Sequence, residues 1–198
     1  LLRHASNIRN VYKLPCVVAI NRFPTDTDAE INFIIGKCRE LGVNTVLSTV
    51  WAEGGKGGEE LAREVVRLCE EEKGDFTFSY ELNTSIEEKI EAVVKKIYGG
   101  NGISVLPAAK KQIETLEKLG FSSLPVCIAK TQYSFSDNPS LLGAPENFTV
   151  TVKNVKISAG AGFIVVLTGD ILTMPGLPKS PAAERIDVDE NGKITGLF

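Results

Sequence analysis

Histidine is almost missing from this chain, because His4 is the only one among 198 residues. One imidazole cannot assemble a histidine-based metal site, so we expect His4 to be an ordinary surface side chain. Cysteine is also sparse, and no two of the four cysteines have the spacing of metal ligands. Their apolar surroundings predict buried free thiols in a reducing compartment, and we expect no metal site. The four are Cys16, Cys38, Cys69 and Cys127.

Long hydrophobic runs and a strong positive charge are missing too. No apolar stretch approaches the ~20 residues that cross a membrane, so we expect no membrane partner. Residues 1–10 are polar and lack the apolar core of a signal peptide, which favours a cytoplasmic protein. The net charge of −3 provides no basic field, so nucleic acid is not an expected partner.

The composition that remains is that of a globular protein. A hydrophobic fraction of 43% supplies a core for one domain or two small ones. The chain begins without methionine, and residues 1–12 look like the end of a helix whose start is missing. We therefore expect this chain to be a piece of a longer protein.

Two short apolar runs, residues 14–20 and 43–47, predict parallel strands joined by a helix. The first run is β-branched and uncharged, as in a strand that is buried on both faces. Thr27 and Glu30 form a capping-box pattern at the start of the helix, and Gly42 is placed to end it. This is a doubly wound α/β unit, in which ligands bind beyond the carboxyl ends of the strands.

Two aromatic side chains follow these strands. Phe23 comes directly after the first strand and Trp51 directly after the second. Because parallel strands bring their carboxyl ends to the same edge, the two rings are expected to face each other there and to hold a flat ligand ring between them. The alternative is that both rings pack in the core.

Glycines dominate residues 54–58, which lead into a helix predicted over about 59–72. Backbone amides of Gly54 and Gly55 could contact a phosphate or a carboxylate. The alternative is a flexible loop that lets Trp51 close over a ligand. The segment is not a nucleotide phosphate loop, because Lys56 is followed by Gly57 and not by serine or threonine.

The second half predicts two amphipathic surface helices, one capped at Thr84 and Ser85 and one starting at Pro107. Their charged residues are expected to lie on solvated faces. A strand at residues 124–129 then leads into a polar loop in which Lys130 and Gln132 could bind an anionic ligand. The alternative is an ordered connector whose polar groups satisfy their own backbone.

Residues 148–157 alternate apolar and polar side chains, which predicts one strand with a wet face. The small residues at 158–162 are expected to form a close-packed turn. The tail resembles the start of a calcium loop at Asp187, but the acid that such a loop needs at its twelfth position falls on Phe198. An Asn-Gly hairpin over residues 190–193 is the better interpretation.

Several of these segments together resemble one family, formate–tetrahydrofolate ligase, also called formyltetrahydrofolate synthetase. The likeness covers the whole chain as about the C-terminal third of the family's polypeptide, and its motifs occur in the family's order. They are residues 18–27, 47–55, 129–134, 160–164 and 173–178.

The resemblance implies an enzyme that joins formate to tetrahydrofolate with ATP and Mg²⁺, through formyl phosphate, to give 10-formyltetrahydrofolate. A monovalent cation, K⁺ or NH₄⁺, activates the family, and its bacterial members are homotetramers. Phe23 and Trp51, with Pro24 beside them, match the positions that hold the pterin. Asn21 and Leu47 match positions near the adenine and the folate site.

By the same resemblance, residues 1–80 are the C-terminal portion of a nucleotide- and folate-binding domain with a P-loop-NTPase-like, mostly parallel sheet. Residues 81–198 then form a smaller α/β domain. The family's Gly-Lys-Thr phosphate loop has no counterpart in this sequence, so we expect no catalytic residue here and no activity from these residues alone.

Two alternatives keep the sheet but not the chemistry. The chain could be a folate- or nucleotide-binding module, or an oligomerisation domain. A G-protein-like NTPase is disfavoured, because Arg22 and Pro24 stand where the guanine-binding motif needs lysine and aspartate.

Overall fold

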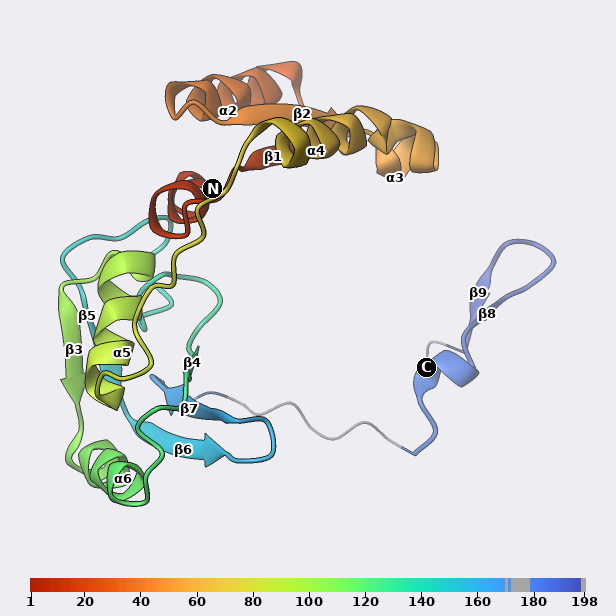
Figure 1. Cartoon of the computed structure of the whole chain (residues 1–198). Coiled ribbons are helices and arrows are strands. Elements are labelled where there is room, and N and C mark those ends of the chain that lie inside the picture. Colours follow the sequence, from red (N-terminus) through yellow and green to blue (C-terminus); the bar gives the residue numbers. More distant parts are fainter. Residues whose placement is uncertain (170, 172–178, 197–198) are drawn as a thin grey trace.

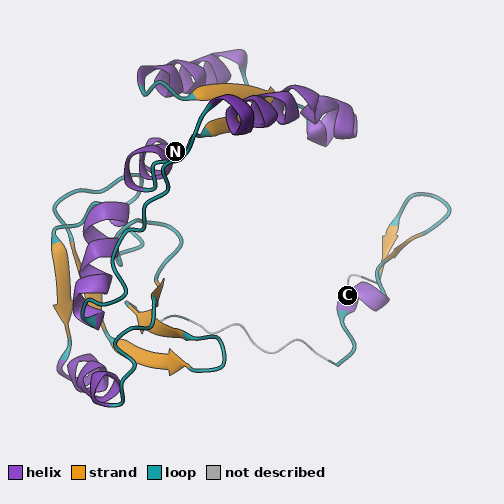
Figure 2. Cartoon of the chain, in the orientation of Figure 1, coloured by secondary structure: helices purple, strands orange, loops and turns teal. Residues whose placement is uncertain are grey.

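The computed structural model describes residues 1–169, 171 and 179–196. The chain is α/β, with parallel strand pairs and helices (Figures 1 and 2). Among the described residues, no helix combines the length and the apolar character that a membrane span needs. The predicted motif at residues 173–178 and Phe198 lie outside the described residues.

The first group of elements is built on a two-stranded parallel sheet (Figure 1). Its register runs from Val17 opposite Asn44 to Asn21 opposite Ser48, which confirms the predicted parallel pairing. The elements are β1 (Val17–Asn21), α2 (Asp28–Glu40), β2 (Asn44–Ser48), α3 (Val50–Glu53), the 3-10 helix η2 (Gly54–Gly58) and α4 (Glu59–Glu71).

The boundaries of α2 follow from local chemistry, as predicted. The Thr27 hydroxyl accepts from the amide of Glu30 at 3.3 Å, and the Glu30 carboxylate accepts from the amide of Thr27 at 3.0 Å. Gly42 takes a left-handed φ of +65° just after the helix, which a residue with a side chain adopts only with strain.

The prediction that β1 is buried on both faces is wrong. Val18 packs against Cys38 of α2 and Ala5, but Ala19 on the opposite face is exposed. The reason is that α4 packs more against β2 than against β1, so that one face of β1 is covered only in part.

The N-terminal helical segment touches both groups of elements. It consists of α1 (Leu2–Ser6) and the π-helix η1 (Asn7–Val11), which confirms the helix predicted there. The side-chain amide of Asn7 donates to the carbonyl of Ile97 at 2.8 Å, and Arg9 donates to the carbonyl of Gly42 at 2.9 Å. Residues of both predicted domains are thus tied to this segment, and the division at residue 80 stays a prediction.

The second group contains two small sheets. Strand β3 pairs in parallel with β5, while β7 lies between β4, to which it is parallel, and β6, to which it is antiparallel. The elements are α5 (Ile86–Val93), the π-helix η3 (Val94–Tyr98), β3 (Gly102–Val105), α6 (Pro107–Lys118), β4 (Val126–Ala129), β5 (Thr149–Val152), β6 (Asn154–Ser158) and β7 (Phe163–Leu167).

The single strand predicted over residues 148–157 is wrong, because the chain changes sheets at Lys153. Residues before it pair with β3 and residues after it pair with β7. The turn at 158–162 is a hairpin connection and is not close-packed, since a Cβ on Gly160 or Gly162 would have no heavy atom within 4 Å.

The helix predicted at Ser85 is confirmed, but not all of its charge is solvated. Ile86 and Ile90 are buried as predicted, and Lys89 between them is fully buried as well. Its ammonium donates to the carbonyls of Ser122 and Leu124. The interpretation of this helix as a surface helix with only solvated charge is therefore wrong at Lys89.

The tail forms the predicted hairpin from β8 (Asp187–Val188) and β9 (Ile194–Thr195), preceded by a 3-10 turn (Ala182–Glu184). The carboxylate of Asp189 accepts from two backbone amides of the turn between the strands.

The thiols are only partly as predicted. Cys38 is buried and Cys16 is half-buried, whereas Cys69 and Cys127 are exposed. Cys127 alternates with core-facing residues of β4, so its side chain points to the opposite side of the sheet.

Candidate functional site

Three of the predicted site residues gather at the carboxyl ends of β1 and β2. Asn21 is the last residue of β1, and the ring centroids of Phe23 and Trp51 lie 5.9 Å apart. Both rings reach solvent, with 42% of Phe23 and 61% of Trp51 exposed, so neither is a core residue. The parallel pairing of the strands brings the two rings together here.

The rings do not leave a slot between them. Their planes are inclined at 54°, and a flat ligand held between two rings needs about 7 Å, which is two contact layers of ~3.5 Å each. The prediction of two rings that face each other across a slot is therefore wrong for this conformation. A ligand ring would stack on an exposed outer face or would separate the pair.

A tight turn carries Phe23. The amide of Phe23 donates to the Asp26 carboxylate at 2.8 Å, and the amide of Asp26 donates to the Phe23 carbonyl at 3.0 Å. Arg22 pairs with Asp28 at 2.9 Å on the exposed side of the same turn. Asp26 was not among the predicted site residues, because its side chain reaches back to an amide three residues earlier, which is the opposite direction to an ordinary Asx turn.

Trp51 lies in the short helix α3, and the glycine segment behind it is folded as the 3-10 helix η2. Gly54 and Gly55 are open to solvent, and α4 begins immediately after η2. Glu59 and Glu60 occupy the first turn of α4, and their charges oppose an anion at that helix end. Anion binding by Gly54 and Gly55 stays a prediction that this charge does not favour.

Asn21 and Leu47 lie next to each other in the sheet. Leu47 is half-buried and pairs with Ile20, while Asn21 is exposed. Asn21 also lines a largely apolar cavity of about 610 Å³ with side chains of α2, among them Ile31 and Phe33. A carboxamide beside an apolar cavity fits a planar, hydrogen-bonding ring.

Lys130 and Gln132 lie elsewhere. They follow β4, which Figure 1 shows well away from α3 and its glycines, so the structure does not bring Gly54 and Gly55 to them. The Lys130 ammonium donates to the carbonyls of Thr131 and Ser134, and burial lowers its pKa, although Asp137 opposes this. These contacts favour the alternative of an ordered connector. Gln132 is exposed beside a cavity of about 350 Å³.

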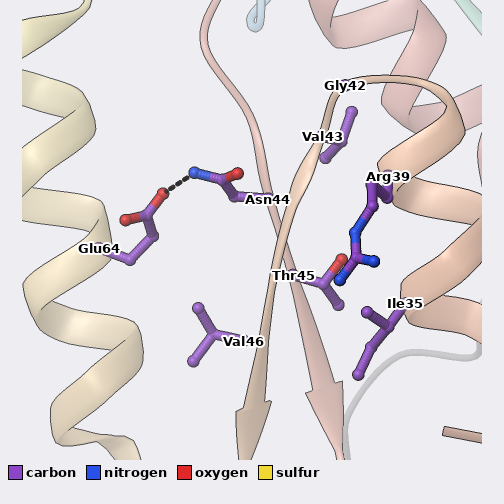
Figure 3. A pocket seen from close by; sticks show the side chains of 8 residues that line it. All are labelled: Ile35, Arg39, Gly42, Val43, Asn44, Thr45, Val46 and Glu64. Carbon is purple, nitrogen blue, oxygen red and sulfur yellow. Dashed lines mark hydrogen bonds between the residues drawn. The ribbon is translucent and has the colours of Figure 1, made fainter. Parts of the chain in front are cut away.

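A further cavity of about 350 Å³ lies along β2, with α2 and α4 on either side of the strand (Figure 3). Across it the side-chain amide of Asn44 donates to the Glu64 carboxylate at 2.6 Å. The guanidinium of Arg67 donates to both oxygens of that carboxylate. These donors, Arg67 first, lower the pKa of Glu64 from 4.5 to about 2. The Asn44 and Glu64 side chains of this lining are thus paired with each other.

The lowered pKa of Glu64 predicts that the fold loses stability in acid. Because its pKa is lower in the folded chain, the carboxylate stabilises the fold fully above pH 4.5, and this contribution is lost as the pH falls toward 2. We expect Glu64→Gln to flatten the fall of Tm across this range, as measured by thermal denaturation. Glu60→Gln removes a charge from the same helix and serves as the control. Equal acid slopes for wild type and Glu64→Gln would contradict the prediction.

The described residues hold no group of three or more His, Cys, Asp or Glu side chains that could bind a metal ion. We therefore assign no residue to the Mg²⁺ that the resemblance implies, an ion that proteins commonly bind through one or two carboxylates together with substrate phosphates.

The whole chain matches a known protein family. A family model described as formate–tetrahydrofolate ligase matches residues 1–198, which is every residue of the sequence. The segments that carry the aromatic pair and the segments of the second group both fall within the match. The chain therefore belongs to the formate–tetrahydrofolate ligase family.

Proposed function

We propose that this chain supplies the folate-contacting surface of an ATP-dependent formate–tetrahydrofolate ligase. The observation that carries the proposal is the pair of adjacent, exposed rings, Phe23 and Trp51, at the carboxyl ends of two parallel strands. Pro24 follows Phe23 and extends the apolar surface. A pterin is flat and mostly apolar, so it gains contact energy by stacking there.

The chemistry explains why such a surface matters. Formate is a poor electrophile, because its carboxylate would have to lose an oxide ion. ATP phosphorylates one formate oxygen to give formyl phosphate and ADP; N10 of tetrahydrofolate then attacks the formyl carbon, inorganic phosphate leaves with the bonding electron pair, and N10 gives up its proton. Holding N10 in register with the formyl carbon supplies much of the acceleration of such a reaction.

Within this proposal, Asn21 and Leu47 contribute to the nucleotide site. The Asn21 carboxamide can form two hydrogen bonds with an adenine edge, and the cavity beside it offers apolar walls. The position of Asn21, at the carboxyl end of a parallel strand, supports a doubly wound, P-loop-NTPase-like arrangement for this part of the protein.

Four further features come from the sequence analysis. They are dependence on Mg²⁺, activation by K⁺ or NH₄⁺, assembly into a homo-oligomer such as a homotetramer, and a cytoplasmic location. We include them in the proposal as properties of the enzyme to which these residues contribute.

We propose that the 198 residues have no ligase activity by themselves. The sequence contains no G-x-x-x-x-G-K-[ST] phosphate loop, and the charge of a transferring phosphoryl group needs such a cradle. The expected result is tetrahydrofolate binding without turnover.

Trp51 makes the test direct, because it is the sole tryptophan of the chain. We expect tetrahydrofolate to quench its fluorescence in a saturable way, while an assay with formate, ATP and tetrahydrofolate yields no 10-formyltetrahydrofolate. p-Aminobenzoylglutamate, which lacks the pterin, is the control and should quench much less. Turnover by the chain would refute the inactivity, and an unchanged Trp51 signal would favour a purely structural or oligomerisation role.

A further inference from the structure

The chain packs too closely at one glycine of η2 to accept a side chain there. A Cβ on Gly57 would lie 2.5 Å from the carbonyl carbon of Thr49 and 2.7 Å from its carbonyl oxygen. Both are backbone atoms, so no side-chain rotation relieves the overlap. The φ of Gly57 lies outside the left-handed region, so close approach and not backbone conformation is what requires glycine here.

A backbone hydrogen bond joins the same two residues. The amide of Thr49 donates to the carbonyl of Gly57 at 3.1 Å. The segment from 49 to 57 is therefore a loop whose two ends touch through main-chain atoms. Trp51 lies inside this loop, two residues after Thr49.

Thr49 also anchors the helix that carries Trp51. The amides of Ala52 and Glu53 donate to the Thr49 carbonyl at 3.0 and 2.9 Å, and the Thr49 hydroxyl donates to the Glu53 carboxylate at 2.6 Å. A shift of Thr49 must therefore move α3, and with it the indole ring that contacts Phe23.

We propose that Gly57 is a positioning residue for the aromatic pair. The missing side chain lets the loop close on Thr49, and this closure sets the distance and the inclination between Trp51 and Phe23. That the pair binds a folate rests on the proposed function. The geometry of the two rings, in contrast, can be measured in the chain without ligand. A misplacement of about 1 Å at a reacting centre can lower a rate ~100-fold, so the closure matters for N10 as well.

The experiment compares Gly57→Ala with Gly36→Ala in the full chain. Gly36 lies in α2 of the same group of elements, and a Cβ on it would have no heavy atom within 4 Å, so it controls for loss of glycine alone. Without ligand, we expect Gly57→Ala to change the near-UV circular dichroism and the emission maximum of Trp51. Equilibrium dialysis with tetrahydrofolate should show about tenfold weaker binding for Gly57→Ala, by analogy with displaced contact residues, and a change of no more than about twofold for Gly36→Ala.

A second variant keeps the test decisive if Gly57→Ala fails to fold, which far-UV circular dichroism would show. Thr49→Ala removes the hydroxyl that holds Glu53 but leaves the main-chain contact, and a smaller change in the Trp51 signals is expected. Wild-type Trp51 signals in a folded Gly57→Ala chain would overturn the proposal, and if that variant does not fold, wild-type Trp51 signals in Thr49→Ala would do so. Altered ligand-free signals in a chain that does not bind tetrahydrofolate would support the positioning role and refute the folate assignment.

Discussion

Replacing Trp51 with alanine is expected to weaken tetrahydrofolate binding by about 5- to 150-fold, because stacking of a heterocycle on one aromatic ring contributes ~1–3 kcal/mol. The ring is 61% exposed, so its removal leaves no cavity in the core and costs the fold little. The loss should therefore appear in affinity and not in stability. Isothermal titration calorimetry measures it, since the variant has no tryptophan to follow.

Two controls separate stacking from a general disturbance. Trp51→Phe keeps an aromatic face and should retain most of the affinity, whereas Phe78→Ala removes an exposed ring that packs on Phe76 and should leave binding unchanged. Because the rings of Phe23 and Trp51 touch, the effects of Phe23→Ala and Trp51→Ala should not add. Full affinity in Trp51→Ala would remove the main support for a pterin site at this edge.

The largest loss of stability is expected for Lys89→Ala. The side chain is fully buried between Ile86 and Ile90, and its ammonium donates to the carbonyls of Ser122 and Leu124. Truncation removes a buried four-carbon stem and leaves both carbonyls without that donor, which together cost about 3–5 kcal/mol of unfolding free energy. Burial lowers the pKa of Lys89, although Glu117 opposes this, so removing the charge recovers part of the loss.

Lys89→Met divides this effect into its parts. Methionine fills most of the same volume but donates no hydrogen bond, so we expect a loss of about 2 kcal/mol, close to that of a hydrogen bond from a charged group. Lys95→Ala, one of the exposed lysines of the adjoining π-helix, should change the free energy of unfolding by no more than about 0.5 kcal/mol. Urea denaturation measures all three variants, and equal values for Lys89→Ala and Lys95→Ala would show that the buried ammonium contributes nothing.

Local chemistry explains which elements were predictable. The capping box at Thr27, the left-handed glycine at Gly42 and the proline at Pro107 each mark a helix boundary within a few residues, and all three lie where predicted. Parallel pairing then followed from the helix between the two strands, and it placed Phe23 near Trp51.

What the sequence could not provide depends on partners far along the chain. Strand β3 is only four residues long and has no periodicity of its own, so it exists through its pairing with β5. Lys89 matches the polar face of an amphipathic helix, but the carbonyls that accept from it lie more than thirty residues later. The inclination of the aromatic rings likewise follows from a main-chain contact between Thr49 and Gly57, which no local sequence pattern predicts.

The place of β7 in its sheet has a consequence for the newly made chain. This strand lies between β4 and β6, yet it is the last of the three to leave the ribosome. At ~5–20 residues per second, β4 remains for some seconds with an unpaired edge before its neighbour exists.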